Sequence, residues 1–462
     1  MNSFLLILLI ILILLFTSKF AKVFFKKEIY LGVLILLKTN KFIKFLDKIA
    51  KNKKILYVFS DIGLVIGFGA FGLDYVSKNK LKKVWKRVLL FLISSIVFII
   101  ISYFSTKGLF LNNPLISKGF IYFLIILTGV MGLSGFTLGS LIFSAYDIII
   151  KLFLGTVANA CPGIGLVIPG VKMPKVDIFI PWYGWIILIF SAVIHEFSHG
   201  AILRSLKLKI KSIGVILAGI LPLGAFVEPD EKQLKKIKDR DLLRMYSAGP
   251  MSNVILAIIF FLLFLAFAPT MTNLSNSIAI EKDDLVYVYS VEKETSICGT
   301  SYNSPAYGVF DVNDVIISVN DINIRNRNDL LNATKLDYDN KYIIMSKDTN
   351  ILETIYLRPN EMGRVGFSVG VVSDPNYIIP KKYYIFKTIY NVLLWSALLN
   401  FIIATVNYLP THPFDGGGMS KVIFSEYLSK KRKIEKRKKI IGTFFGIILI
   451  LLLILNILPY FF

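Results

Sequence analysis

The chain has 462 residues, of which 55% are hydrophobic and 14% aromatic, and its mean hydropathy is +0.66. This composition excludes a soluble globular protein and predicts a multi-pass membrane protein. The formal net charge of +23 does not indicate nucleic-acid binding, because the lysines form short blocks beside apolar segments. Such blocks are typical of the positive-inside bias and of contact with anionic lipid headgroups.

Apolar runs long enough to cross a bilayer of about 30 Å recur along the chain. Backbone polar groups in lipid must bond within their own segment, so each run is expected to be a helix. We expect the first run to be retained rather than cleaved as a signal peptide, because its lysines follow the apolar stretch. The runs are residues 4–16 with their flank, 88–104, 121–154, 182–203, 250–267, 390–409 and 440–460.

The apolar segment 55–75 contains four glycines. Strongly basic stretches, residues 38–54 and 78–87, lie on both sides of it, so both of its ends are expected to face the cytoplasm. It is therefore predicted to be a re-entrant or surface segment rather than a full crossing. For the next span to run inward, segment 121–154 must be a tight hairpin of two short spans, with residues 133–139 as the turn.

The span 182–203 carries the motif HEFSH, an H-E-x-x-H pattern. Positions i and i+4 of a helix lie on one face, so His195 and His199 can direct imidazole nitrogens at one metal ion, with Glu196 beside them. This arrangement is typical of a zinc site with its general base. Ionisable residues inside a membrane span are costly, which favours a functional role over two core histidines.

Basic residues within 204–244 place the C-terminal end of this span on the cytoplasmic side. Among them, segment 212–227 is apolar but holds three glycines and a proline, which argues against a plain helix. A β-hairpin dipping toward the metal would offer an edge strand to an unwound substrate, because a peptide must be extended to be cut. An ordinary helical hairpin is the alternative.

Residues 270–380 are polar and broken by turns, and three stretches within them, 286–289, 315–319 and 352–357, are typical of short strands. They predict a β-rich soluble domain on the outer face of the membrane.

Part of this domain, SPAYGVFDVNDVIISVND at 304–321, is similar to a stretch of PDZ domains. Asn313 and Asp321 replace the usual glycines, and Asn and Asp tolerate a left-handed backbone. PDZ domains bind extended chain ends by adding a strand to a sheet edge. A structural cap without a ligand is the alternative.

A catalytic zinc ion normally has three protein ligands and a fourth position for water. Glu228, Asp230 and Glu231 lie near the histidines in sequence, but they adjoin the basic loop, where salt bridges explain them. Asp415, in NYLPTHPFDGG at 407–417, is the stronger candidate, because the two intervening crossings return the chain to the same side.

Taken alone, Asp415-Gly416-Gly417 is typical of a turn that ends a helix. Pro410 and Pro413 would break the preceding helix and free backbone groups for a site sealed from lipid. His412, the only other histidine, is an alternative third ligand, a donor to the tetrahedral oxyanion, or simply a histidine at the membrane interface.

These motifs, in this order, resemble the site-2 protease family of intramembrane zinc metalloproteases. The resemblance covers roughly residues 182–417. It rests on HEFSH, on Gly249-Pro250 with Asn253 opening the next span, and on Asn407, Pro410, Asp415 and Gly416 in the pattern N-x-x-P-x-x-x-x-D-G.

The resemblance implies that His195, His199 and Asp415 bind one Zn²⁺ ion. Glu196 would activate the water and later protonate the leaving amine, and Asn407 would help to position the substrate. In this family the PDZ-like domain is thought to screen substrates by the size of what remains outside the membrane. Phe414 stands where the family usually has leucine, which is a change between apolar residues.

Together these features predict a polytopic α-helical membrane protein with an inserted small β-rich PDZ-like soluble domain. Residues 1–118 are expected to form an N-terminal membrane extension. Residues 119–269 and 381–462 would form the two parts of the catalytic membrane core, the second with the Asp-Gly motif and the final span, and residues 270–380 the extracytoplasmic PDZ-like domain.

The predicted function is that of a zinc-dependent intramembrane endopeptidase, a hydrolase that cuts transmembrane segments of membrane-protein substrates in regulated intramembrane proteolysis. Its partners would be the substrate and the lipid bilayer of the cell membrane, without nucleic acid, and its active site would lie near the cytoplasmic side. The alternatives are a catalytically inactive scaffold that binds membrane helices and a metal transporter.

Overall fold

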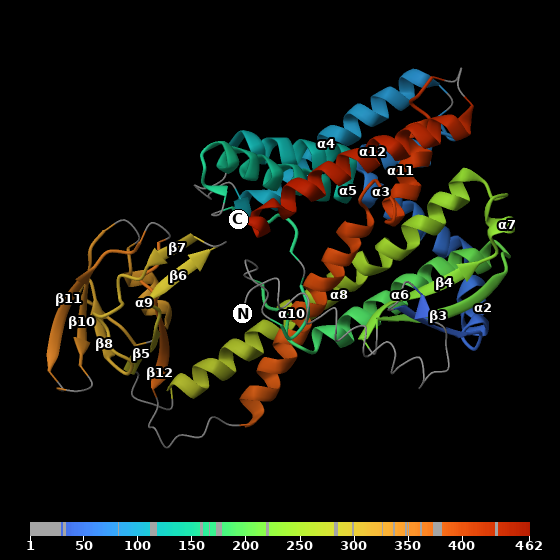
Figure 1. Ribbon diagram of the computed structural model, residues 1–462. Coiled ribbons are helices and arrows are strands. Elements are labelled where there is room, and N and C mark those ends of the chain that lie inside the picture. Colours follow the sequence, from blue (N-terminus) through green and yellow to red (C-terminus); the bar gives the residue numbers. More distant parts are fainter. Residues whose placement is uncertain are drawn as a thin grey trace. The chain divides into compact units, whose positions relative to one another are not determined.

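The computed structural model describes residues 29–30, 34–81, 83–110, 118–157, 160–165, 167–171, 178–218, 221–280, 285–297, 300–325, 327–335, 338–346, 349, 351–360, 363–372, 381–429 and 433–462. The chain divides into two compact units (Figure 1). The first comprises Met1–Phe153, Pro162–Phe261 and Leu394–Phe461, and the second is mainly Leu262–Leu393.

Seven helices within the described residues are long and apolar enough to cross a membrane. They confirm the prediction of a polytopic helical membrane protein, and each predicted run from residue 88 onward corresponds to one of them. The predicted span 4–16 lies outside the described residues. The seven helices are α3 (Lys53–Ser77), α4 (Val84–Phe110), α5 (Lys118–Phe153), α6 (Gly184–Ser205), α8 (Asp239–Ile280), α10 (Lys381–Asn407) and α12 (Ile434–Ile457), the last followed by η2 (Leu458–Phe461).

Helix α5 reverses direction at Gly132, whose φ of 60° and ψ of −147° are open mainly to glycine. The rings of Phe120 and Phe143 stack with centroids 4.0 Å apart, whereas a straight helix would separate these residues by about 35 Å. The predicted hairpin is thus confirmed, with its turn one residue earlier than expected.

Helix α3 has the same kind of break at Gly69, with φ of 54° and ψ of −130°. A Cβ atom added to Gly72 would lie 2.3 Å from the carbonyl oxygen of Leu64, so the chain folds back on itself there. The two turns also touch each other, because a Cβ atom at Gly69 would lie 2.7 Å from the backbone nitrogen of Gly132. A re-entrant segment requires such a reversal; the depth of α3 in a bilayer stays a prediction.

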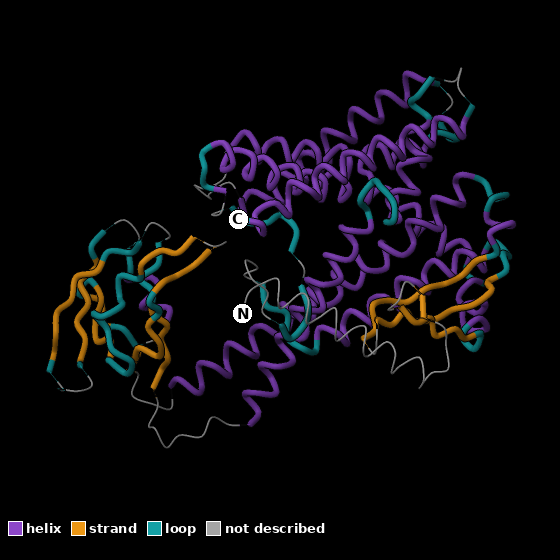
Figure 2. The backbone as a smooth tube through the Cα atoms, viewed as in Figure 1, coloured by secondary structure: helices purple, strands orange, loops and turns teal. Residues whose placement is uncertain are grey.

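The described residues of segment 212–227 form two antiparallel strands, which confirms the prediction that it is not a plain helix. Its strands β3 (Ile210–Ala218) and β4 (Leu221–Pro229) pair antiparallel. An N-terminal strand, β2 (Leu34–Thr39), pairs with β3, and β1 (Ile29–Tyr30) pairs with β2. The sheet order is β1-β2-β3-β4, so β4 is an edge strand (Figure 2). The short helices α2 (Ile43–Ala50) and α7 (Glu231–Leu234) follow β2 and β4.

The second unit contains a sheet of six strands in the order β11-β10-β8-β5-β12, with β9 paired to β8. The predicted strands are confirmed as parts of β5, β8 and β11. Asn313 and Asp321 have φ values of 79° and 65°, the left-handed backbone expected where glycine is replaced. The likeness to a PDZ domain stays a prediction. The elements are β5 (Leu285–Val291), β6 (Glu294–Ile297), β7 (Thr300–Asn303), β8 (Val315–Val319), β9 (Ile322–Asn323), α9 (Arg327–Ala333), β10 (Asn340–Met345), β11 (Leu352–Leu357) and β12 (Phe367–Val372).

A buried core joins α3 and α8 to the end of α10 and to helix α11 (Asp415–Ser425). Its members include Phe68, Leu243, Tyr408 and Met419, each fully buried. Asp415 begins α11, so the Asp-Gly-Gly sequence starts a helix and the interpretation as a helix-ending turn is wrong. The three glycines that follow it let this helix pack closely on the preceding loop and on Tyr246.

Candidate metal centre

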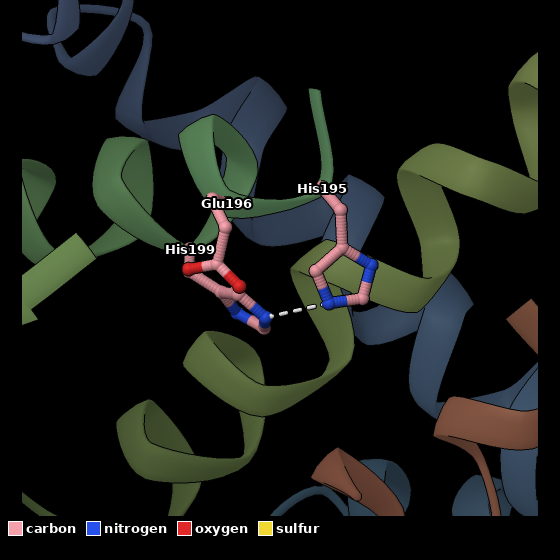
Figure 3. Close-up of side chains that lie close together, drawn as sticks. All are labelled: His195, Glu196 and His199. Carbon is pink, nitrogen blue, oxygen red and sulfur yellow. Dashed lines mark hydrogen bonds between the residues drawn. The ribbon is translucent and has the colours of Figure 1, made fainter. Parts of the chain in front are cut away.

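Helix α6 places three side chains of the HEFSH motif together (Figure 3). His195 and His199 are only 6% and 7% exposed, and their Nε2 atoms lie 3.1 Å apart. The possible ligand atoms of both histidines and of Glu196 lie within 4.8 Å of one another. One turn of helix therefore brings two imidazoles and a carboxylate to one point, as the spacing predicts.

Asp415, at the first turn of α11, completes the cluster. Its Oδ2 atom lies 3.1 Å from Nε2 of His195 and 3.1 Å from Nε2 of His199. The three atoms thus form a nearly equilateral triangle. A tetrahedral zinc ion with ligand bonds of 2.0–2.1 Å separates its ligand atoms by roughly 3.3 Å. The size of the triangle and its two-nitrogen, one-oxygen donor set therefore fit such an ion.

A chain of buried amides fixes which nitrogen of His195 is free to bind a metal. Asn400 donates from Nδ2 to the carbonyl of Ser396, so its Oδ1 is left to accept from Nδ2 of Asn253 at 2.9 Å. Oδ1 of Asn253 then accepts from Nδ1 of His195 at 2.6 Å. The proton of a neutral His195 is held on Nδ1, and the Nε2 lone pair faces Asp415.

His199 is oriented in the same way by the backbone. Its Nδ1 lies 2.6 Å from the carbonyl oxygen of Met245, which can only accept a hydrogen bond. The lone pairs of both Nε2 atoms and an oxygen of Asp415 consequently converge on one point. Such a set of acceptors is stable only around a cation or shared protons, and partners on Nδ1 are the usual support of metal-bound histidines.

Gly249 on α8 lies directly behind the two histidines. A Cβ atom at this position would lie 2.3 Å from Nε2 of His199 and 2.5 Å from Nε2 of His195. Only glycine lets the α8 backbone approach this closely. The pattern G-P-x-x-N drew attention to Gly249 and Asn253 in the sequence, but it did not indicate what either residue contacts.

Glu196 is connected to the edge of the β-hairpin. The backbone N–H of Val227 on β4 donates to its Oε2 at 3.1 Å. Strand β4 pairs with β3 along one side only. Its other side lies next to the carboxylate of Glu196 at Val227. The arrangement places an extended backbone beside the candidate general base.

Asn407 and His412 lie near the cluster in sequence but have different surroundings. Asn407 is half-buried at the end of α10, where its Nδ2 donates to the carbonyl of Ile403. The side chain of His412 is exposed and does not belong to the group of possible ligands found among the described residues. The triangle at the histidines is completed by Asp415 instead.

The other acidic candidates are accounted for by local structure. Glu228 forms an ion pair with Lys38 at 3.0 Å and accepts a hydrogen bond from Ser212. The Ser212 hydroxyl and the Lys38 ammonium hold the pKa of the Glu228 carboxyl below its usual range. Asp230 caps the short helix α7 through the backbone N–H of Lys232 and Gln233. These contacts agree with the expectation of salt bridges beside the basic loop.

Comparison with known proteins gives two matches. The family model of peptidase family M50 matches residues 183–453, more than half of the chain. An uncharacterized protein, MJ0971, of Methanocaldococcus jannaschii is 29% identical over 271 residues, which cover 57% of this chain and 64% of that protein. The chain thus matches less than two thirds of the length of this relative. The segment that matches the family contains His195, His199 and Asp415. The chain therefore belongs to peptidase family M50, the site-2 protease family of zinc metalloproteases.

Proposed function

We propose that this protein is a zinc-dependent endopeptidase that hydrolyses peptide bonds within the transmembrane segments of other membrane proteins. The observation that carries the proposal is the triangle of ligand atoms, with Glu196 beside it, on a helix long enough to span a membrane. Membership of family M50 supports a metallopeptidase at the family level.

His195, His199 and Asp415 would hold the ion through Nε2, Nε2 and Oδ2. When bound, zinc supplies Lewis acidity that polarises a carbonyl group and makes water a stronger acid. The amide chain through Asn253 and the carbonyl of Met245 keep both imidazoles in the ligating tautomer. The protein therefore contributes a preorganised set of donors.

Glu196 would serve as general base and then as general acid. The Val227 N–H holds its Oε2, which leaves Oε1 to take a proton from the attacking water. The same carboxyl group would then give that proton to the leaving amine. A carboxylate beside two histidines of one helix turn is suited to both steps.

The edge strand β4 would present the substrate. A transmembrane helix must unwind before its peptide bonds can be attacked, and an unwound segment can pair with an exposed strand edge. The contact between Val227 and Glu196 makes this edge run past the general base. Asn407 would help to hold the substrate from the α10 side.

The predicted arrangement in the membrane is part of this proposal. Residues 119–269 and 381–462 would form the catalytic core, with the metal centre near the cytoplasmic side. Residues 270–380 would form an extracytoplasmic PDZ-like domain that screens substrates, and residues 1–118 a membrane extension. Basic clusters beside the spans support this orientation.

The test combines metal content with cleavage. Wild type, Glu196→Gln and a control, Glu231→Gln in the exposed helix α7, are purified in detergent, assayed for zinc and incubated with a tagged single-span substrate. We expect about one zinc ion per chain in all three, with cleavage lost only in Glu196→Gln. Wild type that binds no zinc, or a Glu196→Gln variant that cuts at the wild-type rate, would contradict the proposal. Zinc binding without cleavage would favour a scaffold that binds membrane helices.

A further inference from the structure

Helix α3 lies outside the segment that matches family M50, yet it contacts both halves of the metal centre. We propose that α3 is a positioning helix, which sets the distance between the histidine half on α6 and α8 and the Asp415 half at the start of α11. The inference rests on the proposed function, because it concerns the geometry of the same metal centre.

The first contact of α3 is with α8. Asp61 pairs with Arg244 through two bonds, Nε to Oδ1 at 2.8 Å and Nη2 to Oδ2 at 2.9 Å, and with Arg240 at 2.9 Å. Ser247 donates from its hydroxyl to the carbonyl of Ser60 at 2.7 Å. Both contacts flank Met245, whose carbonyl orients His199. The α3 helix thus holds the turn of α8 that supports this ligand.

The second contact is with the loop that precedes Asp415. Tyr408 is fully buried, and its hydroxyl donates to the carbonyl of Gly63 at 2.9 Å. Its ring lies so close to α3 that a Cβ atom at Gly67 would be 2.2 Å from it. The carbonyl oxygen of Tyr408 is in turn 2.3 Å from where a Cβ atom of Gly416 would lie. Tyr408 therefore transmits the position of α3 to the residue next to Asp415.

The two contacts lie on one face of α3. Ser60, Gly63 and Gly67 are spaced i, i+3 and i+7, which places them in line along about 10 Å of helix. This line connects α8 with the end of α10, two elements that are separated in sequence by the whole β-rich unit. Metal ligands must lie within about 0.2 Å of their ideal distances, so a shift of a few tenths of an ångström matters.

The glycine variant tests the distance directly. Gly67→Ala should displace the ring of Tyr408 and, through it, Asp415. Gly119→Ala is a matched control, because a Cβ atom at that position has no neighbour within 4 Å. Each protein is loaded with Co²⁺, and its visible absorption, its zinc affinity by chelator competition, and kcat and KM are measured. We expect Gly67→Ala to change the cobalt spectrum and to bind zinc roughly 10–100-fold more weakly. Its kcat should fall, whereas its KM should stay close to that of wild type.

Three further variants keep the test decisive if Gly67→Ala does not fold. Asp61→Asn weakens the contact between α3 and α8. Asp321→Asn is the control, because it weakens an ion pair with Lys341 within the β-rich unit. Tyr408→Phe removes only the hydroxyl bond to Gly63. Asp61→Asn and Tyr408→Phe should alter the cobalt spectrum, and Asp321→Asn should leave it unchanged.

The outcomes separate the inference from the proposed function. If wild type binds metal and cleaves while Gly67→Ala, Asp61→Asn and Tyr408→Phe keep its spectrum and zinc affinity, α3 is only a scaffold and the positioning role is wrong. If wild type binds neither cobalt nor zinc, the proposed function fails first.

Discussion

The two halves of the metal centre are built in different ways. His195 and His199 come from a single helix turn, so their separation is set by the α-helix itself. Asp415 comes from a helix that begins more than 200 residues later, and its place depends on how a loop, three glycines and Tyr408 pack. One half is fixed by local geometry and the other by tertiary packing. Changes in packing should therefore preserve the spacing of His195 and His199 along their helix, whereas they should move Asp415.

The largest effect should come from deleting a ligand in either half. His195→Ala is expected to abolish zinc binding and cleavage, because only one imidazole and one carboxylate remain. Asp415→Ala should leave the two histidines in place on α6, and so retain weak zinc binding without useful activity. Zinc content after dialysis against graded chelator measures the difference. Equal retention of zinc in Asp415→Ala and wild type would make His412 the leading third ligand.

A smaller effect should follow from crowding the histidine half. Gly249→Ala places a methyl group within 2.5 Å of both Nε2 atoms, so the helices must separate. We expect zinc affinity to fall roughly 10–100-fold, as for other losses of support around a metal. Gly224→Ala is the control, because a Cβ atom there has no neighbour within 4 Å. Unchanged metal affinity in Gly249→Ala would show that α8 does not press on the site.

The amide chain behind His195 should give a graded response. Asn253→Ala removes the acceptor for Nδ1 and should weaken zinc binding by about 10-fold or more. Asn400→Ala leaves that acceptor in place, and Asn253 keeps its second bond to the carbonyl of Ser191, so the effect should be smaller. Isothermal titration with zinc compares the two. A larger loss of zinc affinity in Asn400→Ala than in Asn253→Ala would contradict the proposed order of hydrogen bonds from Asn400 through Asn253 to His195.

The smallest effect on metal binding is expected at Asn407. Its described hydrogen bond is to the carbonyl of Ile403, not to the ligands. Asn407→Ala should leave zinc content unchanged and lower kcat/KM for a single-span substrate. A loss of zinc in this variant would instead show that Asn407 helps to hold Asp415 in its ligating position.

The difference between the halves also explains what could be predicted from the sequence. The helical period alone places His195 and His199 together, and counting crossings brings Asp415 to the same side as they are. Crossings did not separate Asp415 from His412, which the sequence left open as an alternative ligand. The bond between Asn253 and Asn400 could not be predicted, because it depends on the rotation of two helices about their axes. Nor could the pairing of β2 with β3, since LILLKT is a short apolar stretch without alternation.

The spacing of contacts on α3 has a consequence for variation in length. A residue inserted between Ser60 and Gly67 would turn the Gly67 end by about 100° and carry it away from Tyr408. A substitution in this stretch disturbs one contact, whereas an insertion or a deletion changes the register of every contact beyond it. A fragment that starts at residue 183, where the family match begins, would leave Tyr408 uncovered, so the smallest fragment with a complete metal centre should start before Lys53.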